Sequence, residues 1–551
     1  MNKPLLISLA AATLLSSNLS AESMYERIQA MELQMKKMQN ELTTLKAKEA
    51  QTLSKDEETD EAKSEDEGDD EDEGDDKEEA PEKSSDDEGE DEAEPIQDQI
   101  DEIQESITEL NKATNGNHLK FGVDYRFAID NMQYKMADGS TQGNDAFMTN
   151  RFWLNMDWKA NNNLSFRGQL AYNKAFGARS GWNSNYPAME TFDWITNENA
   201  YDDVVRVRSA YFLYVNDTFL GTNIPWTFSI GRRPSTNGHL VNLRDDDGAA
   251  SPMGHTINVE FDGLSSKFSL EDVTGINGMY VKLCAGRGGT NANAKLLTVD
   301  QSSGNPVVAS SPAYASNEND IGDIDLAGLI FVPWTNGQYG IATQYYYANN
   351  LIDANLVPTM IAGQPAYLIN GMKTVGGMHS ITANFTISGI GNEVSDYLDD
   401  TFFFLSGAMN ITNPQSDQGM LGSDIGESVT GYSVWAGLQM PSFMTDEGRW
   451  GLEYNKGSKY WRSITYAEDT NIGSKLAARG DAYEVYFTEP LIEDILSMQV
   501  RYTYIDYKYT GSNGFFGNDT GSATEISESM MGAGAFVDTA QDIRFYLRYR
   551  Y

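Results

Sequence analysis

Alternation of apolar and polar residues over the last nine positions constrains this fold more than any other feature of the sequence. One face of the extended segment carries Ile543, Phe545, Leu547, Tyr549 and Tyr551, and the other carries Arg544, Tyr546, Arg548 and Arg550. In a membrane barrel, one face of each strand meets lipid and the other meets a polar lumen, and the last strand pairs with the first. The segment is therefore predicted to be the closing strand of a transmembrane β-barrel.

The same two-residue period begins at Leu119 and continues through the rest of the chain. It is clearest over 119–130, 151–158, 164–172 and 205–215, and it recurs near 226–231, 278–286, 324–333, 339–348, 377–389, 401–409, 430–439, 449–456, 481–488 and 495–507. With the last strand this makes about 15 visible strands. Because such barrels usually have an even number of antiparallel strands, we predict about 16 to 18. A lumen of that width is expected to be an aqueous channel.

Connections between the expected strands alternate in length. A tight turn occupies 159–163, whereas 173–204, 234–256, 287–322, 349–375, 410–428 and 509–538 are long. In outer-membrane barrels the short turns are periplasmic and the long loops are external. The long segments are therefore predicted outer loops, any one of which could fold inward and narrow the pore.

The N-terminus has the pattern of a secretory signal peptide at 1–21. Lys3 precedes an apolar run from Leu5 to Leu15, and small residues end at Ala21. That run is shorter than the roughly 20 residues needed to span a bilayer. The chain contains one cysteine, Cys284, which excludes an internal disulfide and a covalently attached c-type haem.

Three further segments precede the barrel, which is assigned to 118–551. Residues 22–54 carry a heptad seam and predict a coiled coil, which either self-associates or packs against the barrel. Residues 55–95 hold 25 acidic residues against four lysines, and such a segment buries too little apolar surface to fold. It is interpreted as a disordered spacer, with a divalent-cation buffer or a dock for a basic partner as alternatives. Residues 96–117 predict a second amphipathic helix.

Arginines are frequent on the face of the strands expected to line the lumen. These are Arg126, Arg151, Arg167, Arg206, Arg208, Arg501, Arg544 and Arg548. By strand parity Arg233 also faces inward, next to a loop carrying Asp245, Asp246 and Asp247. Opposed charges of this kind predict a pore constriction. The alternative is that the wall arginines pair with Asp124, Asp157, Glu453 and Glu484 and stiffen the barrel.

No catalytic motif is present. The four histidines, His118, His239, His255 and His379, are scattered, and there is no phosphate loop or nucleophile elbow. We therefore expect no enzymatic activity, no cofactor, no metal site and no nucleic-acid partner.

The segment Gly231-Arg232-Arg233-Pro234-Ser235, together with the expected N-terminal coiled coil, resembles an uncharacterised family of Gram-negative porin-like outer-membrane proteins. The resemblance implies a barrel in the bacterial outer membrane, in contact with lipid and lipopolysaccharide. Because both N-terminal helices precede the barrel, we expect them and the acidic linker to lie in the periplasm. The resemblance also implies that the aromatic Tyr551 is the signal for the barrel assembly machinery.

The expected function is passive diffusion of small hydrophilic solutes or ions through a homo-oligomer, in particular a trimer. One alternative is a structural anchor whose coiled coil tethers a periplasmic or cell-wall partner. Another is the barrel sheath of an electron conduit.

Overall fold

A computed structural model of the chain describes residues 120–176, 201–233, 235–289, 292–293, 297–299, 306–308, 316–317, 321–361, 364–391, 394–465 and 468–551. The chain divides into two units, 1–118 and 119–551. The predicted signal peptide, coiled coil, acidic linker and second helix lie outside the described residues. Within the described residues, no helix is both long enough and apolar enough to cross a bilayer.

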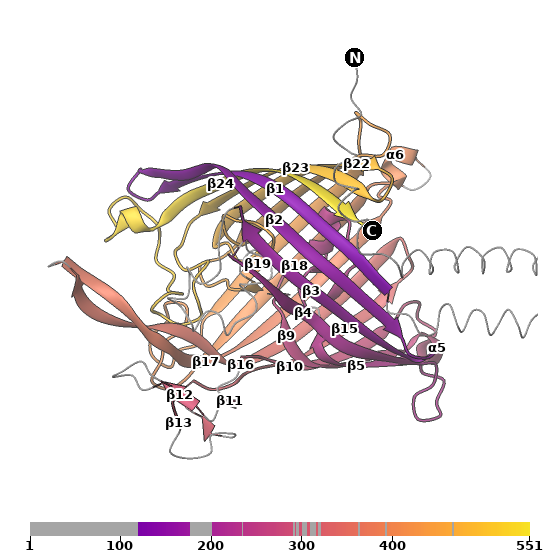
Figure 1. The fold of residues 1–551 in the computed structure, drawn as a ribbon, viewed down its shortest axis with the longest axis horizontal. Coiled ribbons are helices and arrows are strands. Elements are labelled where there is room, and N and C mark those ends of the chain that lie inside the picture. Colours follow the sequence, from indigo (N-terminus) through magenta and orange to yellow (C-terminus); the bar gives the residue numbers. More distant parts are fainter. Residues whose placement is uncertain are drawn as a thin grey trace, which may run out of the picture. The chain divides into compact units, whose positions relative to one another are not determined.

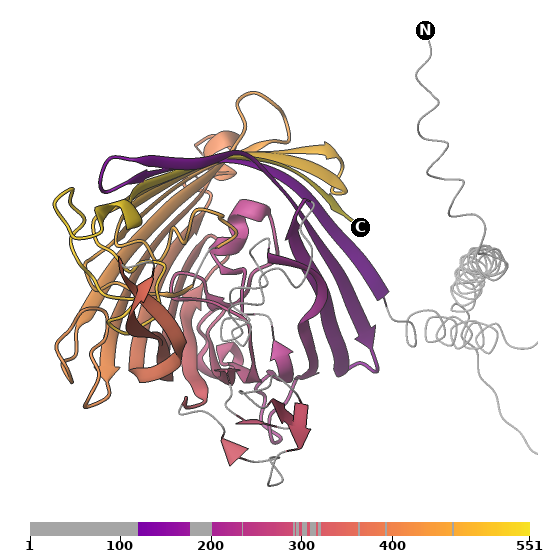
Figure 2. The same ribbon diagram turned by 60° about the vertical axis from the view of Figure 1, so that its left-hand side comes forward.

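Sixteen antiparallel strands of the described chain form a closed barrel, in which β24 pairs back onto β1 (Figures 1 and 2). In chain order the strands are β1 (Lys120–Met136), β2 (Thr141–Lys159), β3 (Leu164–Ala175), β4 (Tyr201–Asn216), β5 (Trp226–Arg233), β9 (Phe261–Ser269), β10 (Tyr280–Gly289), β15 (Ile324–Thr335), β16 (Tyr339–Ile361), β17 (Gln364–Ser388), β18 (Phe402–Pro414), β19 (Thr430–Pro441), β20 (Arg449–Gly457), β22 (Gly480–Ile492), β23 (Leu496–Tyr507) and β24 (Val537–Arg550). The predicted antiparallel barrel is confirmed, with a strand number inside the predicted range.

Strand β9 is the one that the sequence analysis missed. Its outward positions are Asp262, Leu264, Ser266 and Phe268, so polar and apolar residues share the lipid face. A period of two requires one consistently apolar face, and β9 does not have one. It is a strand because both of its neighbours, β5 and β10, pair with it along its length.

The wall has its apolar side chains on the outside. Leu283, Leu405 and Ile543 point outward and are exposed, whereas Ser406 and Thr503 point inward and are buried. A protein folded in water has the opposite arrangement. Exposed apolar outer positions that alternate with polar inner ones are what a barrel wall needs when lipid surrounds it.

Small elements lie outside the barrel sheet. They include the helices α5 (Glu271–Thr274), α6 (Asp396–Asp399) and η2 (Ala533–Ala535), and the strand pairs β11 (Ala292–Asn293) with β14 (Ser316–Asn317) and β12 (Leu297–Val299) with β13 (Pro306–Val308). The prediction that residues 349–375 form an outer loop is wrong. Most of it extends the hairpin of β16 and β17, which are 23 and 25 residues long and protrude from the barrel end (Figure 1).

Two connections run through the barrel interior, and Figure 2 shows chain segments inside the ring of strands. The first inner loop, 235–260, contains β6 (Gly238–His239), η1 (Val241–Asp245), β7 (Ala250–Met253) and β8 (Ile257–Asn258). The second inner loop, 458–479, contains β21 (Ile464–Thr465), which pairs with β8 in parallel. The sequence analysis included most of the first loop among its long loops and did not identify the second.

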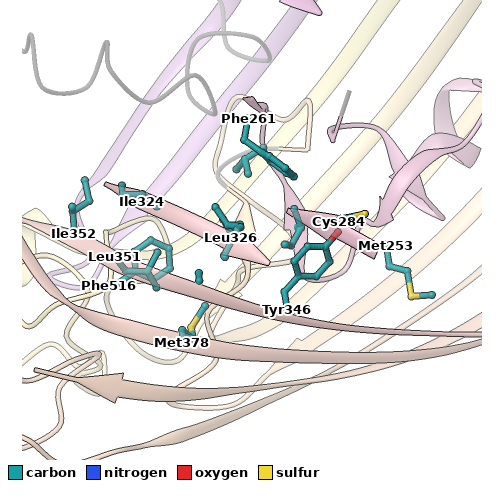
Figure 3. Packing of buried hydrophobic residues seen from close by; sticks show 14 of the residues in the cluster. Met253, Phe261, Cys284, Ile324, Leu326, Tyr346, Leu351, Ile352, Met378 and Phe516 are labelled. Carbon is teal, nitrogen blue, oxygen red and sulfur yellow. The ribbon is translucent and has the colours of Figure 1, made fainter. Parts of the chain in front are cut away.

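Part of the interior is a packed apolar core rather than open lumen, which the sequence analysis did not predict. Figure 3 shows Met253 of the first inner loop among side chains of β10 and β15–β17, with Phe516 at the same cluster. The expectation of an aqueous lumen is wrong for this part of the barrel. The physical reason is that the inward face of β15 is apolar, at Ile324, Leu326 and Ile330, and the inner loops cover it.

Candidate pore constriction

The first inner loop is fixed at its stem, directly after β5. The Ser235 hydroxyl donates to the carbonyl of Val259, and the Thr236 hydroxyl donates to Glu260 Oε1 at 2.5 Å. These bonds join the two ends of the loop next to the wall. The segment between them therefore leaves the stem as a closed unit and crosses the interior.

The far end of this loop is bound to β24. Arg548 Nη1 donates to the carbonyl oxygen of Asp245 at 2.9 Å, and its Nη2 donates to Asp247 Oδ1 at 2.8 Å. The Tyr546 hydroxyl donates to Asp245 Oδ1 at 2.9 Å, and Arg550 donates to the carbonyl of Asp246 at 3.0 Å. The acidic run predicted beside Arg233 therefore lies against the closing strand.

A third attachment joins the first inner loop to β22. Arg244 Nη1 donates to Glu484 Oε1 at 3.1 Å, and its Nη2 donates to the carbonyl of Glu468 in the second inner loop at 2.5 Å. Lys475 lies between two wall carboxylates, 2.7 Å from Glu453 Oε2 and 2.5 Å from Glu484 Oε1. All of these side chains are buried, so each charge needs its partner.

Asp469 is the corresponding anchor of the second inner loop. Its Oδ1 accepts from Arg126 Nη2 at 2.6 Å. Its backbone carbonyl accepts from Arg501 Nη2 at 2.6 Å and from Arg544 Nη1 at 2.7 Å. One residue therefore connects the loop to β1, β23 and β24.

The loop charges are strongly stabilised by this arrangement. Burial alone would raise the pKa of Asp469, but the guanidinium groups of Arg126 and Arg544 outweigh burial and hold that pKa well below its usual range. The pKa of Asp245 is lowered in the same way, mainly by Arg244 against the effect of burial. Both carboxylates are therefore ionised wherever the barrel is folded near neutral pH.

Most predicted constriction residues are brought together at these attachments. Arg126, Asp245, Asp247, Arg501, Arg544 and Arg548 all belong to the network that holds the inner loops. Asp246 is exposed, 3.5 Å from Arg449. Arg208 binds the stem of the first inner loop, and three of the predicted residues lie elsewhere.

Arg167, Arg206 and Arg233 are the residues outside this network. Arg167 is half exposed and lies 3.5 Å from Asp157, and Arg206 is half-buried. Arg208, by contrast, is buried over the Trp153 ring, donates to the Thr236 hydroxyl and lies 3.5 Å from Glu260, at the stem of the first inner loop. Arg233 is buried at the end of β5.

The alternative of cross-strand pairing also matches part of the geometry. Asp124 pairs with Arg548, and Asp157 with Arg167. Glu453 and Glu484 are paired as well, but with Lys475 and Arg244 of the inner loops. Sequence reasoning missed Lys475 and Asp469 because residues 458–479 carry neither a strand period nor a local motif that marks an inward turn.

Beside the first inner loop, an open cavity of about 600 Å³ faces β1–β4. Its lining carries charges of both signs: Lys120, Arg167, Arg208, Arg548 and Arg550 against Asp124, Asp157 and Asp247. Carboxylates and guanidinium groups on facing walls create an electric field across the space between them. Tyr551 also borders the cavity, and its backbone pairs with Val123.

Comparisons with known proteins give one family match and several distant structural similarities. Outer-membrane OmpT of Vibrio cholerae is 12% identical over 79% of this chain and 97% of its own, with a TM-score of 0.39. OprB of Pseudomonas putida is 12% identical over 81% and 97%, with a TM-score of 0.41. An anion-selective porin from Comamonas acidovorans is 10% identical over 79% and 100%, with a TM-score of 0.37.

The TM-scores of these three similarities are below 0.5, so the description of the barrel rests on its own strand pairing. A search of curated proteins gave no significant match. The model of a family described as proteins of unknown function, DUF3373, matches residues 141–551, which is most of the chain and includes β2–β24. The chain therefore belongs to the DUF3373 family.

Proposed function

We propose that this barrel is an outer-membrane channel through which small hydrophilic solutes or ions diffuse passively. The observation that carries the proposal is a wall with apolar residues outside and polar residues inside, enclosing a cavity lined by charges of both signs. The outer face suits lipid, and the charged inner face keeps water and polar solutes in the remaining lumen. The inner loops then act as the constriction.

The charged side chains that hold the first inner loop also line the cavity through which we expect solutes to pass. Arg548 and Arg550 hold the acidic edge of the first inner loop at β24, and Arg167 and Arg208 stand across the cavity on β3 and β4. A solute with a dipole or charge would orient in the field between these groups. Passive diffusion needs no moving part, which suits loops fixed by buried ion pairs.

Planar-bilayer recording of the full-length protein tests the channel. Stepwise conductance is expected, and its absence in bilayers shown to contain folded protein would refute the proposal. Arg167→Gln removes one half-exposed cavity charge and should lower the anion-to-cation permeability ratio, measured from the reversal potential in a salt gradient. The control is Lys456→Gln, which removes a positive charge from the outward face of β20.

A second function is favoured by the packed interior. The apolar cluster around Met253, Leu351 and Phe516 and the buried ion pairs fill part of the lumen. A non-conducting barrel of this kind would serve as an anchor, with residues 22–117 as a periplasmic tether to a cell-wall partner. Folded barrels without conductance, together with loss of envelope integrity on deletion of 22–117, would favour this function.

The proposed cellular setting follows from the barrel. It includes contact with lipid and lipopolysaccharide, insertion by the barrel assembly machinery through Tyr551, and assembly as a trimer. Analytical ultracentrifugation in detergent measures the oligomeric state, and a monomer would contradict the trimer.

A further inference from the structure

A second lumenal cavity, of about 380 Å³, lies between the first inner loop and the wall formed by β9, β10 and β15–β17. Two lysines line it, Lys267 on β9 and Lys282 on β10, and no aspartate or glutamate is among its described lining residues. Burial lowers the pKa of His239, which also lines the cavity, so this imidazole is neutral near pH 7. The cavity wall therefore carries positive charge only.

The two lysines are direct cross-strand partners in the register of β9 and β10. Like charges directly opposite one another destabilise an antiparallel pair. Their observed contacts are with neutral groups: Lys282 donates to the Ser251 hydroxyl, and Lys267 lies 4.1 Å from the centre of the Tyr280 ring. Neither contact neutralises the repulsion.

A third cation stands close by. Arg233 at the end of β5 lies near enough to Lys282 to interact with it electrostatically. Its side chain is more than nine-tenths buried, and its Nε has no hydrogen-bond partner among the described residues. Buried charges normally have partners, and no carboxylate is among the described lining residues of the cavity beside these cations.

The remaining surface of the cavity is apolar. Ile330 and Val332 of β15 and Ala342 of β16 form one side, and Pro252 and Met253 of the first inner loop form the other. This volume is within the range of small-molecule sites, which combine apolar walls with a few polar groups that fix orientation. The first cavity, by contrast, carries both signs of charge.

We propose that this cavity is a binding site for a small organic anion, with its carboxylate between Lys267 and Lys282 and its hydrocarbon body against Ile330 and Val332. The inference deepens the proposed channel function, because it identifies short monocarboxylates as a class of solute that pauses in the lumen. An anion at this position cancels the cross-strand repulsion, and the apolar wall favours a body that inorganic anions lack.

Isothermal titration of hexanoate into the full-length protein in detergent tests the site without requiring conductance. Hexanoate should bind the wild type and raise its melting temperature, because a ligand that binds only the folded state stabilises it. Lys282→Gln and Lys267→Gln should each weaken binding about tenfold, as expected for loss of a charge-assisted hydrogen bond. Lys456→Gln on the outer face should bind as the wild type does.

The melting temperature without ligand provides a second measurement. Each cavity variant should melt above the wild type, because it removes one member of a like-charge pair, and this also shows that the variant folds. No hexanoate binding to folded wild type, or unchanged affinity in both cavity variants, would overturn the proposal. Tighter binding of inorganic phosphate than of hexanoate would overturn the role of the apolar wall. A channel that conducts but binds no hexanoate would leave the proposed function standing and the site refuted.

Discussion

Asp469 and Arg126 form a buried ion pair, with Arg126 Nη2 donating to Asp469 Oδ1 at 2.6 Å across 343 positions of sequence. The pair joins the second inner loop to the first strand of the barrel. Because the backbone of Asp469 also accepts from Arg501 and Arg544, the loop is held by three strands at one point. The position of the second inner loop therefore depends on a residue that is not in the wall.

Replacement of Asp469 by Asn tests this anchor. The change leaves Arg126 without its buried carboxylate, and breaking a buried pair in this way costs about 3–5 kcal/mol. We expect a lower free energy of unfolding in guanidinium chloride and larger, noisier conductance as the loop loosens. The matched control is Asp157→Asn, which breaks the half-exposed pair with Arg167 and should cost about 0–1 kcal/mol. Equal losses in the two variants would show that Asp469 is not an anchor.

Gly457 marks where β20 ends and the second inner loop begins. A Cβ at this position would stand 2.0 Å from the carbonyl oxygen of Ala478, a backbone atom. Gly457→Ala should therefore push the two ends of the loop apart and cost about 1–3 kcal/mol. Gly407→Ala on β18 is the control, because a Cβ there meets nothing within 4 Å. Thermal melting followed by circular dichroism distinguishes the two variants, and matching melting temperatures would contradict this packing.

Burial of His255 in the first inner loop should make the stability of the folded barrel depend on pH. Its ring nitrogens lie 2.8 Å from the Ser406 hydroxyl and 2.9 Å from the Ser433 hydroxyl, and burial lowers its pKa to about 3. The unfolded chain binds a proton on this imidazole below about pH 6.5, whereas the folded barrel does not, so acid favours unfolding between these values. Stability should fall by about 1.4 kcal/mol per pH unit in this window.

Denaturant unfolding at pH 7.5 and pH 5 measures this slope. His255→Gln should flatten it, because the titrating group is gone, while lowering stability at pH 7.5. His379→Gln changes a histidine on the outer face of β17 and should keep the wild-type slope. An unchanged slope in His255→Gln would assign the acid sensitivity to another group.

Replacement of Tyr551 distinguishes a role in the stability of the folded barrel from a role in its assembly. Its side chain is 82% exposed, and its described bonds to Val123 are made by the backbone. Tyr551→Ala should therefore change the free energy of unfolding by no more than about 0.5 kcal/mol. If the assembly machinery reads this residue, the folded fraction in cells should fall while refolding in detergent stays normal. A gel assay of heat-modifiable mobility measures both, and equal loss in both settings would contradict the assembly role.

The sequence predicted the wall well because each strand position is constrained by lipid outside and polar groups inside. Fifteen of the 16 strands were predicted from the two-residue period, and β9 was missed because Asp262 and Ser266 interrupt its lipid face. The sequence predicts a loop at 349–375, where the structure has the extended hairpin of β16 and β17. The reason is that lipid no longer imposes a period of two beyond the barrel edge.

The candidate constriction could be predicted only in part. Strand parity placed Arg126, Arg544 and Arg548 on the inner face, which the structure confirms by their buried lumenal partners. Their partner Asp469 could not be predicted, because its position depends on how a loop crosses the barrel. Pairing between a strand and a distant loop leaves no local pattern in the sequence.

The seam between β1 and β24 has a consequence for the order in which the wall forms. Asp124 is paired with Arg550, and Met136 with Val537, so every pair along this seam joins segments made about 400 residues apart. During synthesis β1 emerges early, and one of its edges has no native partner until β24 exists. An unpaired edge invites pairing with other chains. The free edge of β1 therefore receives its native partner only after the last residues of the chain have been made.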